Sequence, residues 1–260
     1  MQKKQHYSLF KNQKYLPVVL SLQRMKKVYF TDLGLKSYKE VWDLQEAELQ
    51  EIIRQKSVEE ETGNLPVNYL FFTEHPPVYT LGRNGNVAHV LISGDERVEK
   101  GIEYFHTNRG GDITFHGPGQ LVGYPVFDLA QFKMDVGWYL RQLEEVVIRT
   151  LGDYGITGDR SKGETGVWLD PDIPLKARKI CAMGIRCSRW VTMHGLALNV
   201  NTSLHYFDFI IPCGIQNKKV ASIQNELGYE IDMAEVKEKM KHYFEEVFEI
   251  KLENKYLNGA

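Results

Sequence analysis

The sequence predicts an α+β fold. Short apolar stretches typical of strands outnumber amphipathic helical stretches, and the long helices do not alternate regularly with the strands. A doubly wound parallel sheet requires that alternation, so the pattern argues against it. With 260 residues, of which 43% are hydrophobic, the chain is long enough to bury a substantial core.

The first part of the chain predicts one strand and one helix. The strand covers 28–33, and Ser37 is placed to cap the helix that follows. The charged stretch 56–64 ends this helix. Its apolar residues fall near helical spacing at Val41, Leu44, Leu49, Ile52 and Ile53.

The middle of the chain predicts several short strands. Strands over 67–73 and 78–81 flank the turn 74–77, because its two prolines cannot lie inside a central strand. Three more short strands are predicted over 102–107, 113–115 and 121–127.

The second half predicts two helices with strands between them. The first helix covers 136–154 and ends at Gly155, and the second covers 233–248. Apolar residues of the first helix recur at Tyr139, Leu143, Val146, Val147 and Leu151. The intervening strands are predicted over 166–169, 179–186 and 191–200. The sequence leaves open whether the segment from about Ile223 onward is a small subdomain.

Charge is distributed unevenly along the chain. Formal net charge is −2, but residues 1–27 carry seven basic residues and no acid, which leaves 25 basic against 34 acidic residues, a net charge of −9, in the remainder. An acidic body does not indicate a nucleic-acid-binding protein. We expect residues 1–24 to be a disordered tail or untranslated, since Met25-Lys26-Lys27 would itself make a good start; a basic organelle-targeting segment is the alternative.

The number of cysteines and the hydropathy of the chain indicate the cellular compartment. Three cysteines are an odd number, which argues against a disulfide framework and for a reducing environment. No stretch approaches the roughly 20 apolar residues of a membrane span. We therefore expect a cytoplasmic protein that binds neither membrane nor nucleic acid.

The segment RGGDITFHGPGQ, residues 109–120 in the middle of the chain, is rich in glycine. It matches neither the P-loop pattern nor the dinucleotide-binding glycine pattern. Tight turns between short strands are one explanation. The flanking Arg109 and His116 favour another, in which bare backbone lets a ligand approach closely while N–H groups and side chains hold its polar end.

The three cysteines differ in context. Cys181 and Cys187 lie in or beside an apolar strand and are interpreted as structural. Their spacing with His194 does not match a zinc site, so no metal is expected. Cys213 follows an apolar run and precedes Gly214, where a turn could present a thiol to a substrate.

A nucleophilic thiol needs an activating group, because a free thiol with a pKa near 8.5 is mostly protonated at neutral pH. Spacing along the sequence does not choose among the candidates. These are His116, His194, Lys176, Lys179, Lys218 and Lys219.

Several blocks, taken in order, resemble the signatures of one known family. They are Glu74-His75-Pro76-Pro77-Val78-Tyr79-Thr80-Leu81-Gly82-Arg83, the segment 109–120 with Leu121-Val122-Gly123-Tyr124-Pro125, Gly166-Val167-Trp168, Lys179-Ile180, Gly184, His194-Gly195, Asn199-Val200 and Pro212-Cys213-Gly214-Ile215. From about Tyr29 to Leu227 the chain is thus similar to the lipoyl(octanoyl) transferases. So many blocks in one order are far more specific than a single glycine loop.

The resemblance implies a fold and an activity. The fold would be that of the biotin/lipoate protein ligase catalytic domain, a mixed sheet with packed helices, formed by residues 25–260 as one domain. The activity would be an acyl transfer that moves an octanoyl or lipoyl group from acyl carrier protein to one lysine of a lipoyl domain. The acceptors would be 2-oxoacid dehydrogenases and the glycine cleavage H protein. The thioester donor is already activated, so neither a cofactor nor a metal is expected.

The resemblance also implies site residues. Cys213 corresponds to the nucleophile and Lys179 to its activating lysine, while Lys176 is out of register with that block. The substrate contacts map to Arg109, Gly110, Gly111, Asp112, Ile113, Thr114, Phe115 and His116, to Ala182, Met183 and Gly184, and to Gly195, Leu196 and Ala197. The chain departs from the family in three places: Phe115 replaces an expected tyrosine, 170–177 is longer than expected, and 1–24 has no counterpart.

Three other functions remain open on the sequence. A lipoate-protein ligase of the same fold would require ATP and would not need Cys213. A thioesterase would form the same acyl-cysteine and release it to water, and a non-catalytic acyl-binding module would form no covalent bond. The implied protein partners are typically acidic, so a local basic patch is expected near the site. Its candidates are Arg83, Arg178, Arg186, Arg189, Lys218 and Lys219.

Overall fold

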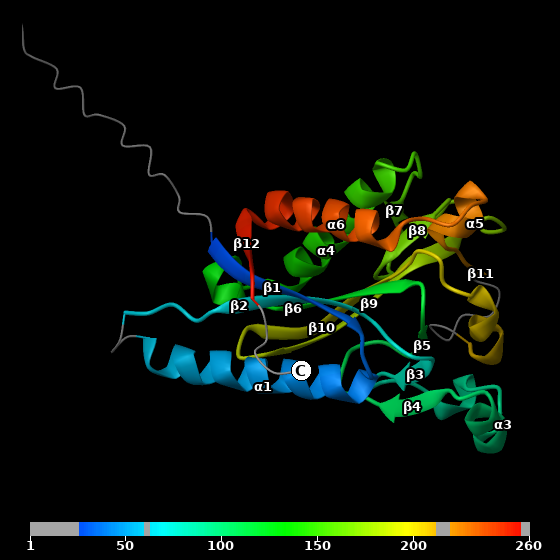
Figure 1. Ribbon diagram of the computed structural model, residues 1–260, viewed down its shortest axis with the longest axis horizontal. Helices are drawn as coiled ribbons and strands as arrows, with labels where there is room; N and C mark the ends of the chain where they lie inside the picture. Colours follow the sequence, from blue (N-terminus) through cyan, green and yellow to red (C-terminus); the bar gives the residue numbers. More distant parts are fainter. Residues whose placement is uncertain (1–25, 60–62, 212–218, 256–260) are drawn as a thin grey trace, which may run out of the picture.

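The computed structural model describes residues 26–59, 63–211 and 219–255 (Figure 1). The α-helices are α1 (Tyr38–Ser57), α3 (Gly94–Glu99), α4 (Val136–Gly152), α5 (Ile223–Leu227) and α6 (Met233–Phe248). The strands are β1 (Lys26–Leu35), β2 (Asn68–Glu74), β3 (Val78–Leu81), β4 (Glu103–His106), β5 (Ile113–His116), β6 (Gln120–Val126), β7 (Asp159–Arg160), β8 (Val167–Leu169), β9 (Arg178–Ser188), β10 (Val191–Asn199), β11 (Lys219–Val220) and β12 (Ile250–Asn254). Short 3₁₀ helices are η1 (Val87–His89), η2 (Leu129–Gln131) and η3 (Leu204–Phe209). The predicted α+β class is confirmed.

The strands form two sheets. The larger is mixed and nine-stranded, in the order β12-β1-β2-β6-β10-β9-β8-β7, with β11 also paired to β9. β1 runs parallel to both β2 and β12, whereas β2, β6, β10 and β9 pair antiparallel. The smaller sheet has the order β4-β3-β5. The turn at Pro76 and Pro77 therefore carries the chain from one sheet to the other, since β2 and β3 belong to different sheets.

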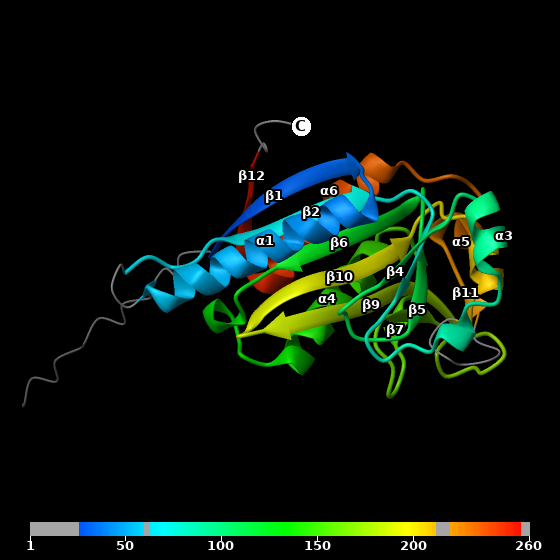
Figure 2. The ribbon, with the colours of Figure 1, turned by 90° about the horizontal axis from the view of Figure 1, so that it is seen from below.

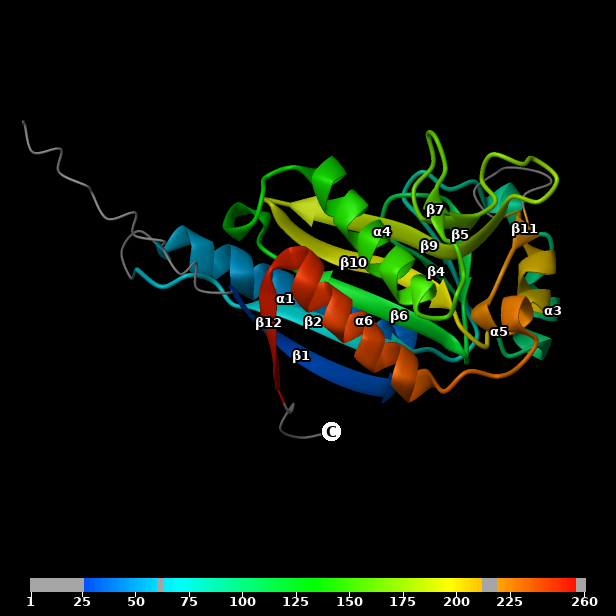
Figure 3. The same ribbon diagram turned by 90° about the horizontal axis from the view of Figure 1, so that it is seen from above.

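Helices cover both faces of the large sheet. Figure 1 shows α4 and α6 on one face and α1 on the other, and Figure 3 shows α4 and α6 lying side by side over the strands. The largest hydrophobic cluster fills the space beneath α4 and α6, and a second lies between the sheet and α1. Ile223, Val236 and Ile250 belong to the largest cluster, so the C-terminal segment shares the main core.

Local sequence signals explain where the long helices begin. Ser37 caps α1 in a capping box with Glu40, and Asp135 accepts a hydrogen bond from the Trp138 amide at the start of α4. The bounds of α6 agree with the prediction, while α4 ends at Gly152, before the predicted end at 154. Within the described ranges, every helix is too short or too polar to cross a membrane.

The small sheet sits at one end of the large one. Figure 2 shows β4 and β5 near the ends of β9 and β10, with α3 at the same end of the molecule. A third hydrophobic cluster, which includes Tyr79, Phe115 and Phe207, packs the small sheet against η3. This arrangement places the glycine-rich segment, which contains β5, against the large sheet.

Candidate active site

A pocket lies where β5 and the loop before it face β9 and β10. The space free of atoms there is about 760 Å³, open solvent at the mouth included, and the centre of a water-sized sphere can occupy about 80 Å³ of it. Thirteen of the residues predicted for the site line it: Arg109, Gly111, Asp112, Ile113, Thr114, His116, Lys179, Ala182, Met183, Gly184, Gly195, Leu196 and Ala197. The fold thus brings the glycine-rich segment against the consecutive strands β9 and β10, which follow it by some 60 residues or more in the sequence.

Other residues complete the pocket without having been predicted as substrate contacts. They are Tyr38, Gln120, Val122, Tyr124, His194, Asn199, Phe207 and Val220. Two predicted residues lie elsewhere: Phe115 stacks on Tyr206 in the third hydrophobic cluster, and the Gly110 amide donates to the carbonyl of Ile185 at 2.8 Å. Gly110 thereby ties the glycine-rich segment to β9.

Small residues form the floor of the pocket. In the antiparallel pair β9 and β10, Ala182 lies opposite Ala197 and Gly184 lies opposite Gly195. Directly opposed residues share a face of the sheet, so these pairs leave room above the strands. A Cβ atom on Gly195 would lie 2.1 Å from the carbonyl oxygen of Gly123, which makes glycine necessary there.

Arg109 braces the loop that forms one wall. Its buried guanidinium donates hydrogen bonds to the backbone oxygens of Thr80 and Asp112 at 2.5 and 2.8 Å, and to the Gly110 oxygen at 3.0 Å. It also donates to the hydroxyl of Thr80 at 2.9 Å. A buried guanidinium is stable only with its donors satisfied, so these bonds fix the loop against β3.

Two buried histidines, His116 in the pocket wall and His75 behind it, are held by hydrogen bonds that define their tautomers. His116 Nδ1 donates to Gln120 Oε1 at 2.7 Å, because Gln120 uses its Nε2 to donate to the oxygens of Phe115 and Asn199. Behind it, His75 donates from Nδ1 to the Lys36 oxygen at 2.7 Å and faces the Tyr124 hydroxyl through Nε2 at 2.9 Å.

His194 is the third buried histidine. Its Nε2 lies 2.8 Å from Asn108 Oδ1, and its Nδ1 has no hydrogen-bond partner within the described part of the chain. Its backbone φ of 59° lies in the left-handed region, which is strained for a residue with a side chain. Burial, with Arg109 and Arg186 nearby, lowers the pKa of His194 to about 3.

All three histidines are held neutral by burial. Burial lowers the pKa of His75 to about 4, and burial, followed by the electrostatic influence of the neighbouring His75, lowers the pKa of His116 well below its usual range. A histidine with so low a pKa accepts a proton poorly near neutral pH. These side chains are therefore suited to hydrogen bonding in their neutral forms.

Lowering the pH from 7 to 5 is expected to destabilise the protein. An unfolded histidine has a pKa near 6.5, so below that pH the unfolded state binds protons that the folded state excludes. The stabilisation is present above pH 6.5 and is lost as the pH falls toward the folded pKa values of about 4 and 3. His75 and His194 should each contribute on the order of 2 kcal/mol to the loss, measured as the free energy of unfolding in urea. Equal stability at both pH values would contradict this expectation.

A β-bulge in β9 places Lys179 on the pocket face. Val167 pairs with Cys181, but the next residue of β8, Trp168, pairs with Lys179, so Ile180 is the extra residue of β9. Ile180 and Cys181 are consecutive, yet both are buried in the largest hydrophobic cluster. In a regular strand Lys179 would share the core face of Cys181; the bulge moves it to the opposite face.

The predicted nucleophile, Cys213, lies outside the described residues. Phe207 and Val220, which flank its segment in sequence, both line the pocket, and Val220 pairs with Lys179 across β11 and β9. Cys181 is fully buried in the main core, and burial raises the pKa of its thiol far above the usual value. Burial also raises the pKa of the partly exposed Cys187. Neither thiol has the lowered pKa of a reactive cysteine.

The other candidate activators are placed differently from Lys179. Lys176 is exposed on the loop before β9 and does not line the pocket, and Lys219 is exposed at the start of β11. Lys218 lies outside the described residues. Within the described ranges, no three acidic, histidine or cysteine side chains come close enough to hold a metal ion.

Comparison with known proteins identifies close relatives. Residues 37–245 match the Lipoyl protein ligase A/B catalytic domain family. The chain is 54% identical over 230 residues to an octanoyltransferase of Christiangramia forsetii, covering 87% of this chain and 98% of the relative. It is 52% identical over 227 residues to an octanoyltransferase of Flavobacterium psychrophilum, covering 86% and 97%.

Solved structures share the fold at low sequence identity. A bipartite lipoate protein ligase of Thermoplasma acidophilum superposes with a TM-score of 0.66 at 17% identity, covering 90% of this chain and 88% of that one. A lipoate-protein ligase A bound with ATP gives a TM-score of 0.61 at 16% identity, covering 90% of each chain. These likenesses confirm the predicted lipoate ligase fold. Together with the identity of about half its residues to octanoyltransferases, the family match shows that this chain belongs to the octanoyltransferase family of acyltransferases.

Proposed function

We propose that the protein transfers an octanoyl group from acyl carrier protein to one lysine of a lipoyl domain, in the cytoplasm. The acceptors are the lipoyl domains of 2-oxoacid dehydrogenases and the glycine cleavage H protein. The observation that supports this most directly is the pocket, because Lys179, six residues of the segment 109–116 and the segments 182–184 and 195–197 line a single space. Its floor of alanine and glycine pairs suits an extended alkyl chain, whose burial contributes about 0.8 kcal/mol for each methylene.

The reaction proceeds in two transfers. The Cys213 thiolate attacks the thioester carbonyl, the bond to the carrier's sulfur breaks, and the carrier leaves as a thiol after taking up a proton. The lysine amine of the acceptor then attacks the Cys213 thioester, forms the amide and loses a proton, and the Cys213 thiolate is released. Backbone N–H groups at the pocket stabilise the oxyanion of each tetrahedral intermediate.

Lys179 supports both transfers. As a cation it stabilises the Cys213 thiolate, and in its neutral form it accepts a proton from the thiol or from the incoming amine. The placement of Lys179 by the β9 bulge, on the face of Ala182 and Gly184, supports this role. Val220, seven residues after Cys213 in the sequence, pairs with Lys179.

Incubation with octanoyl-acyl carrier protein, without ATP, tests the function. We expect intact mass to show one octanoyl adduct on the protein, and addition of a lipoyl domain to move that adduct to the acceptor lysine. An adduct formed only with free octanoate and ATP would indicate a ligase. Release as free octanoate would indicate a thioesterase, and the absence of any adduct would indicate a binding module.

The structure narrows the candidates for a basic docking surface. Arg178 is paired with Asp170 and Glu226, and Arg186 is paired with Glu46, so their charges are largely compensated. Arg83, Arg189 and Lys219 are exposed. Arg83 adjoins the glycine-rich segment through a hydrogen bond from its amide to the Arg109 oxygen, and Lys219 begins β11.

Reversing the charge of Arg83 and Lys219 together to glutamate should raise KM for the acyl carrier by about 3- to 10-fold at low salt, and should flatten its salt dependence. The reason is that an acidic partner would lose part of its long-range attraction. Reversing the exposed Arg54 near the end of α1 and Lys251 on β12 makes the same change in net charge, and neither residue lines the pocket. An equal effect of both double variants would assign the change to net charge and remove Arg83 and Lys219 from the docking surface.

A further inference from the structure

The Gly166-Val167-Trp168 block has no assigned part in the reaction, although Trp168 lies directly beside Lys179. The two residues are opposed across β8 and β9, and the Lys179 ammonium lies 4.6 Å from the centroid of the Trp168 ring. Opposed residues in antiparallel strands share a face of the sheet. The ring therefore lies on the same face as the pocket-lining end of Lys179.

The position of the Trp168 ring is fixed by burial and by its neighbours in β8. Trp168 is 1% exposed, while Val167 and Leu169 on either side face the main core. Gly166, just before β8, has a φ of 110°, and a Cβ atom there would lie 2.4 Å from the Cys181 oxygen. Only glycine lets β8 approach the bulge of β9 this closely.

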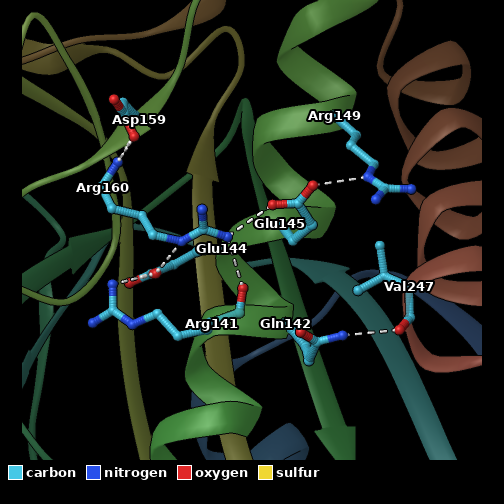
Figure 4. A network of polar contacts seen from close by, with 8 residues as sticks. All are labelled: Arg141, Gln142, Glu144, Glu145, Arg149, Asp159, Arg160 and Val247. Carbon is cyan, nitrogen blue, oxygen red and sulfur yellow. Dashed lines mark hydrogen bonds and ion pairs between the residues drawn. The ribbon is translucent and has the colours of Figure 1, made fainter.

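A buried carboxylate anchors the same end of β8. Glu144 of α4 is fully buried and accepts a hydrogen bond from the Gly166 amide at 3.1 Å. Arg141 and Arg160 donate to the other oxygen of this carboxylate at 2.7 and 3.1 Å (Figure 4). Arg160 belongs to β7, so the network joins α4, β7 and the start of β8 into one support.

We propose that Trp168 is a positioning residue for Lys179, holding the lysine as a cation on the pocket side of β9 by a cation–π contact. This inference rests on the proposed function, in which that cation stabilises the Cys213 thiolate. An indole face attracts an ammonium more strongly than the other aromatic rings do, and it does so without hydrogen bonds that would hinder proton transfer. Trp168 acts through Lys179 and does not itself contact the reacting atoms.

The pH dependence of Cys213 alkylation by iodoacetamide tests the proposal without any acyl substrate. Peptide mass analysis reports the modification of Cys213 separately from that of the other cysteines. Trp168→Met keeps much of the bulk but removes the ring, and we expect it to lower the thiolate fraction of Cys213 at pH 7 by about 3- to 30-fold. Trp168→Phe keeps a weaker ring face, and we expect a loss of about 2- to 3-fold. Raising the pH to 9 should restore most of the reaction, which a purely structural defect would not allow.

Two further variants separate the possible failures. Tyr154→Met removes a comparable contact, between Lys239 and Tyr154 at 5.2 Å, and should leave Cys213 alkylation unchanged. If Lys179→Met slows alkylation at pH 7 but Trp168→Met and Trp168→Phe do not, the positioning role of Trp168 is wrong and the proposed function stands. If Lys179→Met has no effect either, the coupling between lysine and cysteine in the proposed function is wrong. Should Trp168→Met fail to fold, the Phe variant decides alone, and a thiolate fraction equal to that of the unchanged protein overturns the proposal.

Discussion

Cys213→Ala is expected to abolish the octanoyl adduct, because neither of the other two cysteines is suited to replace its thiol. Cys181 is buried in the main core with a raised thiol pKa, and the thiol pKa of Cys187 is also raised. Intact mass after incubation with octanoyl-acyl carrier protein measures the adduct, and circular dichroism checks that the variant remains folded.

Cys187→Ala provides the matched control. This substitution removes a partly exposed thiol near the C-terminal end of β9, and the variant should form the octanoyl adduct normally. Cys181→Ala should do the same if that core substitution folds. An adduct that persists in Cys213→Ala, or one that maps to Cys181, would refute the assignment of the nucleophile.

Lys179→Ala should slow acylation by roughly 10²- to 10⁴-fold, the usual loss when an acid–base group is removed. The thiol pKa of Cys213 should rise toward its free value near 8.5, because the nearby cation is lost. Single-turnover acylation and alkylation measured against pH report these two effects separately. Combining Lys179→Ala with Cys213→Ala should reduce the activity little further than Cys213→Ala alone, since both groups serve one step.

Lys176→Ala is the control for this substitution, because it removes an exposed lysine three residues earlier that does not line the pocket. It should leave the rate unchanged. A normal rate and thiol pKa in Lys179→Ala would instead move the proton-transfer role to another group. Burial holds His116 and His194 neutral with low pKa values, so neither is well suited to replace it.

Local signals carried much of the fold prediction. Ser37 and the spacing of Val41, Leu49 and Ile52 predicted α1, since a cap and a buried stripe are properties of neighbouring residues. β12 was missed because five residues of mixed polarity show no clear period, and their pairing with β1 depends on a contact across the whole chain. The resemblance to a family located the site segments; composition and spacing alone left six candidate activators.

The β9 bulge and its consequence for Lys179 were also missed. Strand periodicity assumes that alternate residues share a face, and one inserted residue reverses that assignment for everything before it. The sequence does hold a signal: Ile180 and Cys181 are consecutive apolar residues, and both face the core. Tyr38 and Tyr124 were missed as pocket residues for another reason, because α1 and β6 reach the pocket only through tertiary packing.

The pairing of β12 with β1 has a consequence for synthesis of the chain. A ribosome releases residues 26–35 before the other described strands, but their partner at 250–254 emerges only after all of those strands have been made. Until then the outer edge of β1 presents unpaired N–H and C=O groups, which are able to pair with other nascent chains. A translation stop before Ile250 would leave that edge open permanently. Shortened chains that lack β12 should therefore aggregate during expression even though every pocket residue described here precedes the truncation.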